Sequence, residues 1–121
     1  MGHILQRVRI SAEKAATVRM LVDTGATFSV IPESLARSVG IIPLRRSVPM
    51  TLADGRRARV TAGTAVFRIR KREAPATILV GDVVEPILGV ETLEALGLVV
   101  DSRRQRLIPS RNYAARLGSY R

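Results

Sequence analysis

Cysteine is absent from the sequence, and its 121 residues include a single histidine, His3, close to the N-terminus. Without cysteine there is no disulfide framework, no thiol nucleophile and no thiolate metal site. A histidine in a terminal segment does not supply the imidazole that serine–histidine catalysis or a multi-histidine zinc site holds inside the fold. Carboxylates remain for hydrolytic chemistry, and we expect neither a metal nor a cofactor.

Long apolar runs and aromatic side chains are scarce as well. No uninterrupted apolar stretch approaches the roughly 20 residues needed to cross a bilayer, and no signal peptide is visible. We therefore expect no membrane span, and the cytoplasm is the default location. Aromatic residues make up only 3% of the chain, so platforms on which single-stranded nucleic acid could stack are few.

Acidic residues are outnumbered by basic ones, 10 against 20, which gives a formal net charge of +10. One interpretation is a polyanionic partner such as nucleic acid. The other is an arginine-rich surface that is simply solvated, and we favour this second interpretation. Nucleic acid is thus not the expected partner, although the charge leaves such binding open.

Turn signals divide the chain into many short apolar segments, a pattern typical of a mostly-β domain. Two short helices are predicted, over 32–40 and 90–96, each closed by a glycine. We assign residues 1–109 to one domain and residues 110–121 to a basic C-terminal tail that is only partly ordered. Strands are expected over 4–10, 18–22, 48–52, 57–61, 65–70, 77–80, 98–100 and 106–108, with a polar connection over 11–17.

An Asp-Gly pair, Asp54-Gly55, separates the expected strands 48–52 and 57–61. Glycine tolerates the positive φ that a tight turn demands, so this pair predicts a hairpin. Asp54 itself is more typical of a turn residue than of a catalytic group.

Asp23, Thr24 and Gly25 follow an apolar segment that indicates a buried strand. A carboxylate at such a place is unfavourable unless it is hydrogen-bonded, because desolvation disfavours its charged form. Gly25 allows a tight turn and the close approach of another chain. Alone, the tripeptide is typical of a mere turn. A weak internal repeat indicates more than a turn. Leu21-Val22 before this turn and Ile87-Leu88 before Gly89 are both apolar pairs that lead through glycine toward a helix.

These segments resemble the retropepsin-like aspartic proteases, a single-domain family that has retroviral, cellular and bacterial members. The likeness runs from about Val18 to Asp101 and rests on the order and spacing of Leu21–Ala26, Thr77–Gly81 and Ile87–Gly89 with its helix. It implies a closed, β-barrel-like acid-protease domain with two short helices that dimerises. The cellular and bacterial relatives are the closer likeness.

The resemblance also implies roles for individual residues. Asp23 would be catalytic, Thr24 would tie the two active-site loops of a dimer together, and the carbonyl of Gly25 would receive the substrate backbone. The hairpin tip would be a flap over the cleft. The candidate substrate contacts are Leu21, Gly25, Ala26, Ala53, Asp54, Gly55, Val80 and Ile87, and core packing explains Leu21, Val80 and Ile87 equally well.

Peptide hydrolysis by carboxylates needs two of them, one to take a proton from water and one to donate a proton to the carbonyl oxygen. Held about 3 Å apart, two carboxylates share one proton. This chain has one Asp-Thr-Gly, and Asp101-Ser102-Arg103 lacks the glycine. A two-fold axis places equivalent residues opposite each other. The sequence therefore predicts a homodimeric endopeptidase in which the Asp23 carboxylates of both subunits activate one water to cleave a polypeptide.

Three departures from the retroviral pattern keep a second hypothesis open. Retroviral members usually carry an acidic residue where this chain has Thr27 and an arginine where it has Val90. The flap segment also carries charges near its tip. The alternative is a non-catalytic module of the same fold that binds polypeptides or serves dimerisation.

Overall fold

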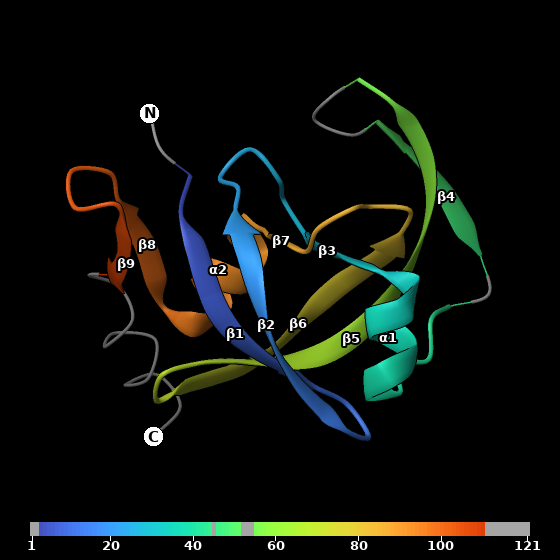
Figure 1. Ribbon diagram of the computed structural model, residues 1–121, viewed down its shortest axis with the longest axis horizontal. Coiled ribbons are helices and arrows are strands. Elements are labelled where there is room, and N and C mark those ends of the chain that lie inside the picture. Colours follow the sequence, from blue (N-terminus) through green and yellow to red (C-terminus); the bar gives the residue numbers. More distant parts are fainter. Residues whose placement is uncertain (1–2, 45, 52–54, 111–121) are drawn as a thin grey trace.

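The structure is a computed structural model, and it describes residues 3–44, 46–51 and 55–110. The expected mostly-β domain with two short helices is confirmed (Figure 1). In chain order the elements are β1 (Leu5–Ser11), β2 (Ala15–Val22), β3 (Ser29–Pro32), α1 (Glu33–Val39), β4 (Ser47–Thr51), β5 (Arg57–Ile69), β6 (Arg72–Gly81), β7 (Ile87–Leu88), α2 (Val90–Leu96), β8 (Leu98–Asp101) and β9 (Arg106–Pro109).

Seven strands form one sheet in the order β1-β2-β7-β3-β6-β5-β4, and β8 pairs with β9 separately. The β1–β5 pairing is additional, so the hydrogen-bonded path through β1, β2, β7, β3, β6 and β5 returns to β1. Most neighbours are antiparallel, but β2 pairs with β7 and β3 pairs with β6 in parallel. The short strand β7 therefore lies between β2 and β3, which are consecutive in the chain.

Two hydrophobic clusters lie on the two sides of this curved sheet. The larger one contains the fully buried Phe67, Ile10 and Met20 and receives the inner faces of α1 and α2. The smaller one consists of Val30, Val60 and Leu79, with partly buried side chains packed against it. Alternation along the strands separates the two, because successive side chains point to opposite faces.

Both helices end where the sequence indicates. Gly40 and Gly97 adopt left-handed conformations, with φ of 78° and 70°, and their N–H groups donate to carbonyls of the last helical turn. A residue with a Cβ adopts this conformation less readily, which explains glycine at both stops.

Several strand limits differ from the expectations. β2 begins at Ala15, so the predicted polar connection over 11–17 is wrong: a short turn joins β1 to β2 in an antiparallel pair that reaches Ser11↔Ala15. The two strands expected over 57–61 and 65–70 are one 13-residue strand, β5, that continues through Gly63. β3 was not expected at all. In each case cross-strand pairing extends a strand into residues whose local preferences are weak.

Three expectations fall partly or wholly outside the described residues: the tip of the Asp54-Gly55 hairpin, the end of the strand expected over 48–52, and the C-terminal tail. Of the hairpin turn the structure describes Gly55, whose φ of 87° is positive. The last strand, β9, ends at Pro109. Among the described residues, no helix has the length and apolar character to cross a membrane.

Gly89 is required by a close approach of two backbones. Its φ of −96° is open to any residue, but an added Cβ would lie 2.5 Å from the carbonyl carbon of Phe28 and 2.9 Å from the nitrogen of Ser29. These are main-chain atoms, which cannot turn aside as a side chain can. The β7–α2 junction therefore packs directly on the chain that enters β3.

We expect Gly89→Ala to lower the free energy of unfolding by about 1–3 kcal/mol, the range typical of overpacking. Urea denaturation followed by circular dichroism measures this. The matched control is Gly63→Ala, because the nearest atom to its Cβ, at 2.9 Å, is a methyl group of the Ile41 side chain. Equal stability losses in the two variants would contradict the backbone-clash explanation.

Candidate active site

Asp23 lies immediately after β2, at the start of a loop that leads into β3. Its N–H donates to the carbonyl of Leu88 over 3.0 Å, so the backbone of the residue is tied to β7. The neighbouring Leu21 N–H donates to the carbonyl of Pro86 over 2.9 Å. The half-buried Asp23 is thus placed by the inserted strand β7 as much as by its own strand.

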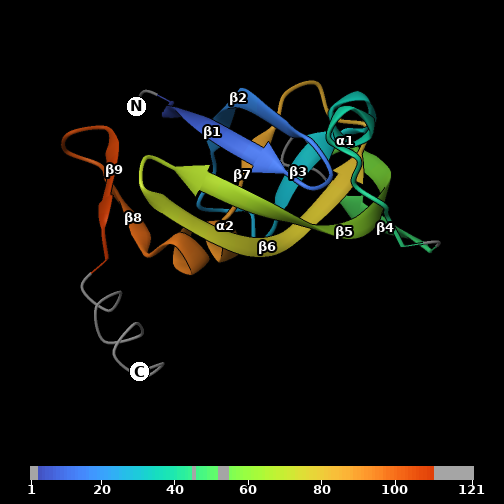
Figure 2. The same ribbon diagram turned by 90° about the horizontal axis from the view of Figure 1, so that it is seen from below.

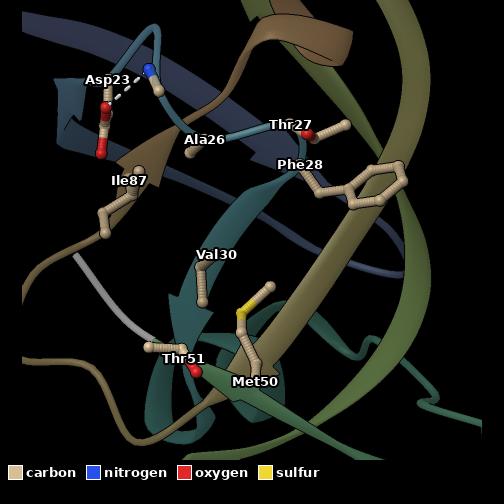
Figure 3. A pocket seen from close by; sticks show the side chains of 9 residues that line it. Asp23, Ala26, Thr27, Phe28, Val30, Met50, Thr51 and Ile87 are labelled. Carbon is tan, nitrogen blue, oxygen red and sulfur yellow. Dashed lines mark hydrogen bonds between the residues drawn. The ribbon is translucent and has the colours of Figure 1, made fainter. Parts of the chain in front are cut away.

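The loop folds back on the carboxylate. The N–H of Gly25 donates to Oδ1 of Asp23 over 2.9 Å, the dashed line in Figure 3. The N–H of Ala26 donates to the Asp23 carbonyl over 3.1 Å. A Cβ on residue 25 would lie 3.2 Å from that same Oδ1. The glycine therefore supplies a donor and leaves room for the acceptor, and one carboxylate oxygen is held in a fixed position.

The far side of the loop is attached to the first turn of α2. The carbonyls of Ala26 and Thr27 accept hydrogen bonds from the N–H groups of Val90 and Glu91, each over 2.8 Å. Below them the hydroxyls of Ser29 and Thr92, both fully buried, lie 2.6 Å apart. The Ser29 hydroxyl also accepts the N–H of Gly89 over 3.0 Å. A buried, fully paired polar cluster of this kind fixes one register between the loop and the helix.

A pocket of about 410 Å³ opens beside the carboxylate. Figure 3 shows Asp23 and Ile87 at one end, with Val30 and Met50 near each other further along. Asp23 is the one charged side chain among the described residues that line the pocket. The lining consists of Asp23, Gly25, Ala26, Thr27, Phe28, Val30, Met50, Thr51 and Ile87.

The apolar part of this pocket belongs to the smaller hydrophobic cluster. Val30 is a buried member, and Phe28, Met50 and Ile87 pack against it while still facing the pocket. A concave apolar surface with one carboxylate at its edge is a common form of binding site. The arrangement suits an apolar group that is held next to the Asp23 carboxylate.

The structure brings together four of the sequence-predicted site residues: Asp23, Gly25, Ala26 and Ile87 all line the pocket. Thr24 is exposed and does not line it. Leu21 is half-buried and pairs with Ile87 in the sheet, outside the pocket lining. Gly55 is exposed, and apart from its chain neighbours no atom of the described residues lies within 4 Å of an added Cβ. Ala53 and Asp54 lie outside the described residues.

Val80 has 5% of its surface exposed and packs in the larger cluster, on the other face of the sheet from the pocket. Its neighbour Leu79 belongs to the smaller cluster on the pocket side. Three consecutive apolar residues on β6 do not reveal which one faces the cleft, because the strand is buried on both faces.

Sequence reasoning missed five pocket residues. They are Thr27, Phe28, Val30, Met50 and Thr51. Phe28 and Val30 belong to a segment in which Ser29, Val30 and Ile31 are all buried, so no period of two marks strand β3 in the sequence. Met50 and Thr51 come from β4, whose position depends on its pairing with β5, and no local signal would have placed them here.

The other acidic side chains that the structure describes do not line the pocket. Asp101 accepts hydrogen bonds at Oδ1 from the N–H groups of Arg103 and Arg104, at 3.1 and 3.3 Å, in the turn between β8 and β9. Glu91 accepts the N–H of Thr77 over 2.9 Å. In the part of the chain that the structure describes, no three acidic or histidine side chains gather in a way that could hold a metal ion.

One solved structure that the chain resembles is EIAV protease complexed with the inhibitor HBY-793, with a TM-score of 0.64. The identity is 21%, over 79% of this chain and 89% of the viral one, and it shows a shared fold. The expected retropepsin-like fold is therefore confirmed. No curated protein is similar enough to count as a match.

A family model described as "gag-polyprotein putative aspartyl protease" matches residues 8–95. The matched span begins in β1 and ends in α2, so it includes the Asp23 loop, the strand inserted beside it and every described pocket residue. With more than half of its length matched and the retroviral protease fold present, this chain belongs to the gag-type aspartyl protease family.

Proposed function

We propose that the protein is a homodimeric aspartic endopeptidase in which Asp23 of each subunit supplies one of two catalytic carboxylates. The observation that carries the proposal is the Asp23 loop. It holds a half-buried carboxylate at the edge of an apolar pocket, with one of its oxygens fixed by the Gly25 N–H. Family membership supports the aspartic protease class.

The chemistry follows from a pair of carboxylates that share one proton. The ionised member takes a proton from water, and the water oxygen forms a bond to the carbonyl carbon of the peptide. The protonated member gives its proton to the carbonyl oxygen, so a gem-diol forms. As the gem-diol collapses and the C–N bond breaks, the carboxyl that took the water proton gives it to the leaving nitrogen, and the ionised carboxylate takes a proton from one gem-diol hydroxyl. The Gly25 N–H, which donates to Oδ1 of Asp23, would help to orient the carboxylate for these proton transfers.

Dimerisation is proposed because the described pocket contains one carboxylate. The other candidate from the sequence, Asp101, is engaged in the β8–β9 turn and does not line the pocket. A two-fold axis next to the loop would bring the partner's Asp23 to the same water. The exposed position of Thr24 suits its proposed role of contacting the same loop of the other subunit.

The proposed substrate is an extended polypeptide that lies across the pocket. Apolar side chains would enter the space between Phe28, Val30, Met50 and Ile87, and the backbone would bond to the Gly25 carbonyl. Residues 53–55 are proposed as a flap over this substrate. Val80 and Leu21 are left out of the proposal, since neither lines the pocket.

Asp23→Asn is expected to reduce the cleavage of an unfolded protein at mildly acidic pH by at least about a hundredfold, the contribution expected of a general base. Peptide products are quantified by mass spectrometry. The matched control is Asp101→Asn, the same change in charge and size outside the pocket, which should keep activity. Circular dichroism should show both variants folded. Unchanged cleavage by Asp23→Asn would overturn the catalytic assignment. If Asp101→Asn alone lost activity, Asp101 and not Asp23 would be the catalytic carboxylate.

Mixing tests the sharing of one site by two subunits. Wild-type and Asp23→Asn chains are refolded together in equal amounts at constant total concentration. If each site needs both carboxylates, about a quarter of the dimers are active, because subunits combine at random in a two-fold dimer. Independent active sites would leave half of the activity, and that result would contradict the dimeric mechanism.

Sedimentation of the same samples gives the oligomeric state, and together with the cleavage assay it distinguishes an enzyme from a binding module. A dimer without turnover under any condition would support the non-catalytic alternative, in which the pocket binds polypeptide segments without cleaving them. A monomer that still cleaves would contradict the proposed site.

A further inference from the structure

Five arginines lie on one outer face of the sheet, and none of them lines the Asp23 pocket. Figure 2 looks toward β1 and β5 on this side of the molecule. The five come from three neighbouring strands and the turn that follows β5, and all are exposed. We call them the basic face: Arg7, Arg9, Arg19, Arg68 and Arg70.

Strand register places these cations directly opposite one another. Arg7 pairs with Arg19 between β1 and β2, and Arg9 pairs with Arg68 between β1 and β5. Like charges directly opposite each other on neighbouring strands destabilise a sheet. The fold therefore gains no stability from this arrangement, and an anion bound between the arginines would relieve the repulsion.

Few acidic side chains lie near the basic face to neutralise its charge. Glu73 is opposite Arg68 between β5 and β6 and is itself exposed. Arg68 donates through Nε to the carbonyl of Arg70 over 2.9 Å, a bond that holds the side chain without neutralising it. Among the described residues, none of the five arginines has an acidic side chain within ion-pair distance.

The centre of the basic face is hollowed. A shallow pocket of about 320 Å³ is lined by Arg7, Arg9, Arg68 and Arg70 together with Gln6 and Thr17. Four guanidinium groups and two neutral polar side chains thus face one space. This pocket shares no lining residue with the Asp23 pocket.

We propose that the basic face binds the phosphate backbone of a nucleic acid without reading its bases. The planar fork of a guanidinium matches a phosphate group and donates two hydrogen bonds to it. Residues two apart on a strand lie about 7 Å from each other and neighbouring strands about 5 Å, so the face spans more than one phosphate. The net charge of +10 would draw a polyanion toward the protein from a distance.

A nucleic acid fits better than a membrane. Surface-binding helices and loops anchor in lipid through apolar side chains among their basic ones. On β1, β2 and β5 of the described chain, Leu5 is the exposed large hydrophobic residue, and the others lie on different elements. Aromatic stacking is also missing from the described part of this face, because Phe67 on β5 is fully buried. Recognition would therefore rest on phosphates, and a duplex should bind at least as well as a single strand.

The test measures binding of the full-length protein to a short fluorescent duplex of mixed sequence by anisotropy, between about 50 and 200 mM salt. The double variant Arg9→Gln/Arg68→Gln removes the central cross-strand pair. We expect its affinity to fall roughly tenfold per arginine near 0.1 M salt, and the slope of log K against log salt to become shallower by about one per arginine. Thermal unfolding should show equal or greater stability, since a repulsion has been removed.

Matched controls carry the same change in charge elsewhere. Arg37→Gln/Arg103→Gln alters α1 and the β8–β9 turn, and Arg111→Gln/Arg116→Gln alters the C-terminal tail; both should keep most of the affinity and the slope. Glu73→Gln should strengthen binding, because it removes the acidic neighbour of Arg68. The inference does not depend on Asp23, so Asp23→Asn should bind the duplex as the wild type does.

Several outcomes would overturn the proposal. Absent or salt-insensitive binding would exclude a phosphate-backbone site. An equal loss in the control variants would show that overall charge, and not the basic face, attracts the duplex. Loss confined to the tail variant would place the site in the tail, and binding to anionic lipid vesicles without binding to the duplex would identify a membrane surface instead.

Discussion

The insertion of β7 between β2 and β3 is the constraint on which the site depends. This strand has two residues, yet it pairs with β2 through Leu21↔Ile87 and Val22↔Leu88 and with β3 through Val30↔Ile87. Because it occupies the space between two strands that are consecutive in the chain, the segment that joins them must leave the sheet. That segment is the Asp23 loop, and its departure from the sheet exposes the carboxylate to the pocket.

Two residues of pairing cannot hold such an arrangement alone, and the contacts next to β7 complete it. Gly89 allows the α2 junction to lie against the backbone of Phe28, and the Ser29–Thr92 hydroxyl pair fixes the register with no exposed surface. These contacts are all within one chain. The loop is therefore held by contacts of its own chain, and in the proposed dimer a partner would contribute the second carboxylate.

The residues that could be predicted from the sequence are those with local signatures. Asp23 and Gly25 follow an apolar strand, and the glycines that end α1 and α2 mark their helices without reference to the rest of the fold. The two segments of the internal repeat, Leu21-Val22 and Ile87-Leu88, lie side by side as parallel strands.

Residues without such signatures depend on tertiary pairing. Met50 reaches the pocket only because β4 pairs with the long strand β5. On β6, Leu79 belongs to the smaller cluster on the pocket side and Val80 to the larger cluster on the other face, and both residues are buried. Neither outcome can be read from the order of apolar residues.

The placement of the arginines also depends on tertiary pairing. The composition sets an excess of ten positive charges, but the register of three strands decides that Arg7, Arg9 and Arg68 meet on one face. The Asp23 pocket, in the part that the structure describes, has a single acidic group and an apolar floor. Added salt screens exposed charges and leaves apolar burial almost unchanged. Salt would therefore weaken the proposed binding of a polyanion to the basic face and leave the proposed binding of a polypeptide to the Asp23 pocket almost unchanged, because the two surfaces would use different forces.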